Sequence, residues 1–140
     1  MGEDADVNIT DFNVFFYLCG KQQNIMSAPQ NWNELCDRLS EMFKMEVDLN
    51  GVLYLVGVRE RGLMLQKFSK FEKWSLINLG SCVLYKEIGM VEELGTDRDG
   101  WPIFREKSVL TNWTEERKQK TLQDCALRYF AKVFEGNTAG

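Results

Sequence analysis

Histidine is absent from this chain of 140 residues, and its absence removes more functional classes than any motif adds. Histidine has the ordinary side-chain pKa closest to neutral pH, and catalytic triads, Cys-His dyads and most zinc enzymes depend on it. The sequence therefore excludes Ser-His-Asp and Cys-His catalysis, H-E-x-x-H zinc sites and imidazole pH switches. It also lacks the glycine-rich motifs G-x-x-x-x-G-K-[ST] and G-x-G-x-x-G, so nothing in it predicts a phosphate-binding loop.

Long apolar runs are missing as well. No stretch approaches the ~18 apolar residues that a membrane span needs. The chain starts Met-Gly-Glu-Asp-Ala-Asp, which is acidic where a secretory signal is basic. We therefore expect a cytoplasmic protein with no membrane partner.

The cysteines do not form the C-x-x-C pairs that are typical of metal sites. Each lies within an apolar stretch, which in a reducing cytoplasm predicts a small buried side chain with a free thiol. We expect no disulfide, no metal and no cofactor. The four cysteines are Cys19, Cys36, Cys82 and Cys125.

Length and composition predict one globular domain over residues 1–140, because this is close to the commonest domain size. The net charge is −4, and the acidic excess lies in residues 1–50, which carry three basic and nine acidic side chains. Binding to a phosphate backbone needs a basic face, so we expect no nucleic-acid partner.

Three segments share the pattern of a helix start, in which a capping residue is followed three positions later by glutamate. They predict helices that begin near residues 32, 70 and 113, capped by Asn31, Ser69 and Asn112. Apolar residues follow at helical spacing, so each helix should bury one face in a common core. The predicted buried residues are Leu35, Leu39, Met42 and Phe43 in the first helix, Phe71, Trp74, Ile77, Leu84 and Ile88 in the second, and Leu122, Cys125, Ala126, Tyr129, Phe130 and Val133 in the third.

Glycines mark further positions on these helices. Gly89 and Gly136 are expected to end the second and third helices, because glycine readily adopts the left-handed conformation found at helix C-termini. Gly51 and Gly57 are interpreted as close-packing positions within a helix.

Residues 11–20 and 48–57 match at five of ten positions, and each segment precedes a capping pattern. This indicates a duplicated helix–loop–helix unit over residues 8–44 and 48–88, in which Tyr17 and Tyr54 would be equivalent. The apolar run in the second unit is equally compatible with a buried strand, because short runs do not distinguish the two.

After the second predicted helix the helical spacing stops and two short extended segments flank a polar turn. Asp99 and Gly100 form a typical turn dipeptide, and Pro102 favours an extended Trp101. We predict a small hairpin or ordered loop near residues 90–106. The predicted fold class is mainly α, a single-domain helical bundle of about four to five helices.

The acidic turn is not expected to bind a metal. Asp97-Arg-Asp-Gly100 resembles the opening of a calcium loop, but the third ligand before glycine and the glutamate six residues after it are both missing. The carboxylates of residues 92–99 are interpreted as a solvated loop.

Three short motifs also carry a resemblance to a known family. They are VLYLVG at residues 52–57, FSKFEK at residues 68–73 and GTDRDGWP at residues 95–102. In this order they resemble a family of small, functionally uncharacterised all-α proteins from Bacteroidetes-type bacteria, over a little over half the chain. The resemblance implies a helical cytoplasmic protein and no activity. Family members carry a histidine in the middle of the second helix, where this chain has Asn78, so an imidazole role does not carry over.

Two hypotheses for the function follow. The first is a non-enzymatic protein that binds another protein or itself, because four Trp, nine Phe and six Met supply apolar surface of the kind enriched in interfaces. The second is a small-molecule-binding protein or a histidine-free enzyme, with an aromatic pocket between helices closed by the acidic turn. Trp101 is expected either to anchor that turn on the core or to stand at a binding surface. The candidate binding residues are Tyr17, Tyr54, Trp74, Asp97, Asp99 and Trp101.

Overall fold

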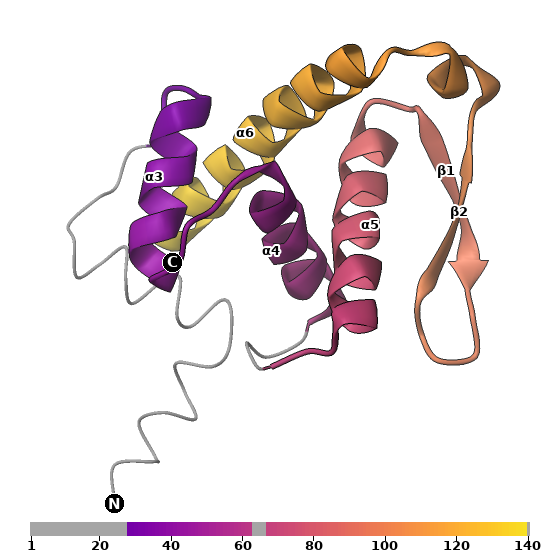
Figure 1. Cartoon of the computed structure of the whole chain (residues 1–140), viewed down its shortest axis with the longest axis horizontal. Coiled ribbons are helices and arrows are strands. Elements are labelled where there is room, and N and C mark those ends of the chain that lie inside the picture. Colours follow the sequence, from indigo (N-terminus) through magenta and orange to yellow (C-terminus); the bar gives the residue numbers. More distant parts are fainter. Residues whose placement is uncertain (1–27, 63–66, 140) are drawn as a thin grey trace, which may run out of the picture.

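The computed structural model describes residues 28–62 and 67–139 of the chain. Within these residues the protein is mainly helical, with four helices, a two-stranded antiparallel hairpin and a 3₁₀ turn (Figure 1). This confirms the predicted fold class and the predicted position of the hairpin. In chain order the elements are α3 (Trp32–Phe43), α4 (Leu49–Arg61), α5 (Lys70–Glu87), β1 (Val91–Thr96), β2 (Pro102–Glu106), η1 (Ser108–Asn112) and α6 (Glu115–Ala139).

Two of the three predicted helix starts are confirmed by their caps. The side chain of Asn31 accepts a hydrogen bond from the Glu34 N–H at 2.8 Å at the start of α3. At the start of α5, Ser69 accepts from the Glu72 N–H at 3.1 Å, and the Glu72 carboxylate accepts from the Ser69 N–H at 2.8 Å. This second arrangement is a complete capping box, which satisfies two backbone donors that the helix leaves unpaired.

The third predicted helix start was wrong by two residues. Asn112 closes η1, Trp113 is extended, and α6 begins at Glu115. The hydroxyl of Thr114 accepts a hydrogen bond from the Arg117 N–H at 3.0 Å, so Thr114 does the capping. The capping pattern did not indicate Thr114, because Arg117 and not glutamate follows it three positions later.

Of the two predicted helix ends, one is confirmed and one is wrong. Gly89 has φ +76° just after α5 and donates a backbone hydrogen bond to the Lys86 carbonyl at 3.0 Å, as a left-handed terminal residue should. Gly136 does not end the last helix, because α6 continues to Ala139.

The run at residues 52–56 is helical, which excludes the strand alternative. The Asp48 side chain caps α4 by accepting from the Gly51 N–H at 2.9 Å, and Gly62 ends the helix with φ +68°. Helices α4 and α5 fall within the second predicted repeat unit. Most of the first part of the other unit, including Tyr17, lies outside the described residues.

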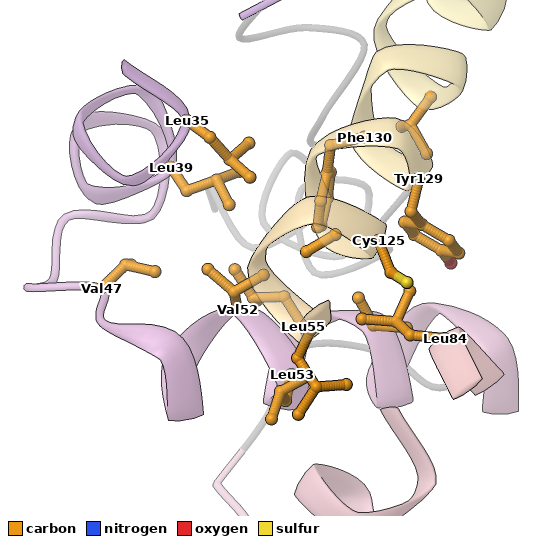
Figure 2. Close-up of a cluster of buried hydrophobic side chains, with 14 of the residues drawn as sticks. Leu35, Leu39, Val47, Val52, Leu53, Leu55, Leu84, Cys125, Tyr129 and Phe130 are labelled. Carbon is orange, nitrogen blue, oxygen red and sulfur yellow. The ribbon is translucent and has the colours of Figure 1, made fainter. Parts of the chain in front are cut away.

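The core lies where α3, α4, α5 and α6 meet, and Figure 2 shows its side chains pointing toward one another from these helices. Leu35 and Leu39 of α3 are fully buried, as is Phe130 of α6. All six residues predicted to be buried on the last helix are buried, and on α3 only Phe43 is less than fully so. The apolar spacing therefore located the inner faces of α3 and α6 correctly.

Helices α4 and α5 cross as an antiparallel pair with their backbones in direct contact. A Cβ atom added at Gly57 would lie 2.1 Å from the Leu76 carbonyl oxygen, and one added at Gly80 would lie 2.1 Å from the Leu53 carbonyl oxygen. Only glycine leaves room for this approach at either position. The close-packing interpretation of Gly57 is thus confirmed, and Gly80 is its counterpart on the partner helix.

The crossing explains an error in the predicted buried face of α5. Phe71 and Trp74 were expected in the core, yet their side chains are 80% and 55% exposed. The Gly80 contact turns Leu76, Leu79 and Leu84 inward instead. Phe71 and Trp74 therefore end on the outer surface of the first two turns.

The hairpin lies beside α5, on the side opposite α4 (Figure 1). Its strands pair antiparallel from Val91 opposite Glu106 to Thr96 opposite Pro102, with a bulge between Glu93 and Gly95. Buried Val91 joins the hairpin to the core, and an ion pair at 2.7 Å links Lys86 of α5 to Glu93. These contacts fix the hairpin against α5 and leave a groove between them.

Candidate functional site: a groove between α5 and the hairpin

The groove has a volume of about 580 Å³ and opens to solvent. One wall comes from the first turns of α5 and the other from the tip and second strand of the hairpin. Its lining consists of Phe71, Glu72, Ser75, Asn78 and Leu79 from α5 and of Asp97, Asp99, Trp101, Pro102 and Phe104 from the hairpin.

Three of the six predicted site residues meet in this groove, namely Asp97, Asp99 and Trp101. Tyr54 lines a separate pocket of about 320 Å³, together with Lys67, Lys73 and others. Trp74 is on the outer surface of α5 and lines neither site. Tyr17 lies outside the described residues.

A compact turn holds the acidic tip of the hairpin. One carboxylate oxygen of Asp97 accepts hydrogen bonds from the backbone N–H groups of Asp99 and Trp101, both at 2.9 Å. The Asp97 N–H donates to the Trp101 carbonyl at 2.8 Å, and Gly100 takes up φ +90° between them. The turn chemistry expected from the sequence is therefore present, and it fixes Asp97 at the groove.

Trp101 connects this tip to the end of α4. The guanidinium of Arg61 lies over the indole, 4.6 Å from the ring centroid, which is a cation–π distance. Arg61 Nε is buried and has no hydrogen-bond partner among the described residues. Trp101 is itself partly buried against the core while it lines the groove, so its position is compatible with both alternatives that the sequence left open.

The α5 wall is equally well defined. The capping box fixes Glu72 at the start of the helix, so its carboxylate is positioned by a hydrogen bond to the Ser69 backbone. Phe71 precedes it with most of its ring in solvent. The sequence pattern did not indicate this wall, because apolar spacing predicted Phe71 to be in the core and predicted only a capping role for Glu72.

A second polar cluster, away from the groove, surrounds Tyr129. The Tyr129 hydroxyl donates to the Glu60 carboxylate and accepts from Arg59 Nη1 at 2.9 Å. Burial, reinforced by the hydrogen bond to Glu60, raises the pKa of Tyr129. A phenol held neutral in this way is a poor general base at neutral pH.

The cysteines of the described residues are free thiols. Burial raises the pKa of Cys82 to about 11 and also raises the pKa values of Cys36 and Cys125. Arg128 lies 3.4 Å from the Cys125 sulfur, but burial outweighs its effect. A raised pKa disfavours the thiolate that nucleophilic catalysis requires.

No protein-family model, curated protein or solved structure matches this chain. Within residues 28–62 and 67–139, no three His, Cys, Asp or Glu side chains are grouped closely enough to hold a metal ion. None of the helices in this part combines the length and apolar character that crossing a membrane requires.

Proposed function

We propose that this protein is a non-enzymatic binding module that holds a segment of a partner protein in the groove between α5 and the hairpin. The observation that carries the proposal is the exposure of two large aromatic side chains in the first turns of α5. Phe71 lines the groove, and Trp74 lies one turn further along the same helix, outside the lining. Single exposed apolar residues are common, but two exposed aromatic rings one turn apart beside a groove are typical of an interaction surface.

The energetics of burial support this use of the surface. Covering a phenylalanine side chain contributes about 2 kcal/mol, and Phe71 has most of its ring to cover. Aromatic residues are also enriched at interfaces, where a few of them supply most of the binding energy. Phe71 and Trp74 are therefore the expected anchors of the interface.

The walls are positioned before any partner arrives. The capping box holds the α5 wall at Glu72, and the side-chain hydrogen bonds of Asp97 hold the hairpin wall. A preorganised site loses less conformational entropy on binding, which favours recognition of a short segment.

A segment of another protein fits the groove better than a second copy of this chain. Each copy carries a net charge of −4, and the groove adds three carboxylates to the contact surface. Two such surfaces repel each other, so self-association through this groove is disfavoured.

The alternative of a small-molecule site between aromatic residues of the helices is less well supported. Tyr54 lines the pocket beside Lys67 and Lys73, and Trp74 lines neither that pocket nor the groove. We place the binding module in the cytoplasm as part of this proposal, supported by the free thiols of Cys36, Cys82 and Cys125.

The proposal is tested by selecting a displayed library of random twelve-residue peptides on the purified chain. The enriched peptide, labelled with fluorescein, is then titrated with the wild type and with the double variant Phe71→Ser/Trp74→Ser. We expect the double variant to bind at least about tenfold more weakly, because both anchors are lost.

The matched control is Leu94→Ser/Val109→Ser, which removes two exposed apolar side chains that lie on β1 and η1, outside the first turns of α5 and outside the groove lining. It should change the affinity less than about twofold, in line with residues outside an interface core. Failure to enrich any peptide, or equal binding by Phe71→Ser/Trp74→Ser and the wild type, would overturn the proposal.

A further inference from the structure

We infer that the segment held by the groove is basic and places a Lys or Arg side chain, flanked by an apolar residue, against the carboxylates of Glu72, Asp97 and Asp99. This inference rests on the proposed function and specifies the chemistry of the partner. It follows from the charges of the lining, from how the carboxylates are held and from the aromatic rings beside them.

The charged residues of the groove lining are all acidic. The lining contains the three carboxylates and no Lys or Arg. Among the ion pairs of the described residues, none includes Glu72, Asp97 or Asp99. By contrast, Glu92 and Glu93, on the neighbouring strand, are both paired. The carboxylates at the groove thus differ from those of β1 in having no cationic partner among the described residues.

Two of the carboxylates are held in place by bonds to the backbone. One oxygen of Asp97 accepts from two N–H groups, and one oxygen of Glu72 accepts from the Ser69 N–H. These bonds orient each carboxylate and leave its other oxygen without a described hydrogen bond. An oriented carboxylate is suited to the charge-assisted hydrogen bonds that guanidinium and ammonium groups donate.

The rest of the lining is suited to the remainder of a basic side chain. Phe71, Trp101 and Phe104 surround the carboxylates with apolar and aromatic surface. The methylene stem of Lys or Arg packs on such surface while its charged end reaches a polar group, and aromatic rings attract the cation directly. The protein already uses this chemistry internally, since Arg61 lies over Trp101 and Arg117 lies 4.0 Å from the Trp113 ring centroid.

Some cations of the chain are neighbours of lining residues without belonging to the lining themselves. Lys70 and Lys73 flank Phe71 and Glu72 in α5, and Arg98 is an exposed residue of the turn between the two aspartates. Arg61 is engaged with Trp101. These cations weaken the negative potential of the groove at a distance, but the charged groups that a bound side chain would contact directly are the carboxylates.

The test uses the peptide enriched by the library and a charge-neutral triple variant, Glu72→Gln/Asp97→Asn/Asp99→Asn. Glutamine is compatible with the capping box, and asparagine retains the acceptor oxygen that position 97 needs, so the walls should keep their shape. The enriched peptide should contain Lys or Arg, and the triple variant should bind it at least about tenfold more weakly. Replacing every Lys and Arg of the peptide with Gln should weaken its binding to the wild type to a similar extent.

The matched control is Asp37→Asn/Glu41→Gln/Glu46→Gln, which removes three exposed carboxylates on and after α3. It changes the net charge by the same amount, so it should weaken binding less than about twofold if local contacts decide. An equal loss in this control, or an enriched peptide without basic residues, overturns the inference.

The two proposals fail in distinguishable ways. Binding of the peptide can depend on Phe71 and Trp74 and yet be unchanged by Glu72→Gln/Asp97→Asn/Asp99→Asn. That result would support the binding module and overturn the inference that its partner is basic. A library that enriches no peptide overturns both.

Discussion

The two halves of α5 use the same kinds of residue for opposite purposes. From Leu76 onward the helix packs among α4, α6 and β1, with Leu76, Leu79 and Leu84 in the interior. Its first turns present Phe71 and Trp74 to solvent. Apolar residues at helical spacing occur in both halves, so hydrophobicity alone does not distinguish the core from the interaction surface.

The difference arises from the crossing with α4. The Gly57 and Gly80 contacts fix which face of α5 is turned inward, and that choice is rigid because two backbones are in direct contact. The first turns of the helix inherit the same rotation, which carries Phe71 and Trp74 outward. Changing the crossing or either half of the helix should therefore have separate, ranked effects.

The largest effect is expected from Gly57→Ala or Gly80→Ala. A methyl group would collide with a carbonyl of the partner helix, and the two helices would have to separate. We expect a loss of about 3 kcal/mol in the free energy of unfolding, at the upper end of the usual cost of overpacking, as measured by urea denaturation.

Gly51→Ala is the matched control, because the added methyl would meet only the Val47 side chain, at 3.2 Å. Its stability should change by less than about 1 kcal/mol, since the gain in helix propensity opposes a mild contact. Similar losses at Gly51 and Gly57 would contradict the backbone-contact explanation.

The second effect concerns Trp101, which joins the hairpin to the helical part. Trp101→Ala should cost about 2 kcal/mol of stability, because full burial of the ring would make the loss about 3–5 kcal/mol and this ring is only partly buried. A double-mutant cycle with Arg61→Met should give a coupling of about 0.5–1 kcal/mol from the stacked pair. Thermal and urea unfolding measure both quantities, and a stability equal to that of the wild type would show that the tip is not anchored.

The third effect is a pH dependence that belongs to the buried half. Burial raises the pKa of Tyr85 to about 12, whereas an unfolded tyrosine titrates near 10. The neutral phenol is therefore favoured by folding, and its contribution to stability is present below about pH 10 and is lost as the pH rises toward 12. Tyr85→Phe should unfold with a smaller loss of stability between pH 9 and pH 11 than the wild type does, as followed by circular dichroism in urea. An identical loss in both proteins would rule out this tyrosine as a source.

The smallest effect is expected from Phe71→Ser in the exposed half. Because the ring is 80% exposed, the free energy of unfolding should change by less than about 0.5 kcal/mol. The same variant loses peptide binding if the groove is the interaction site, so stability and binding respond separately. A loss above about 1.5 kcal/mol would indicate that Phe71 is a core residue, as the apolar spacing predicted.

Local signals in the sequence were sufficient for much of the fold. The caps at Asn31 and Ser69 act through hydrogen bonds between residues three apart, so the helix starts were readable without tertiary information. The turn at Asp97 is local in the same sense. The error at Asn112 shows the limit, because the pattern is complete there and yet the extended backbone at Trp113 leaves Thr114 to cap the helix.

The sequence by itself determined the exclusion of histidine chemistry, the helical class and the inner faces of α3 and α6, since these follow from composition and from interactions within a few turns. The tertiary structure alone decided the rotation of α5 and the wall that faces Trp101. Both depend on contacts between distant segments, namely Gly57 with Leu76 and the hairpin with α5. A helix with apolar residues on several sides has no preferred inner face until a neighbour packs against it, which is why Phe71 looked like core and lies at the groove.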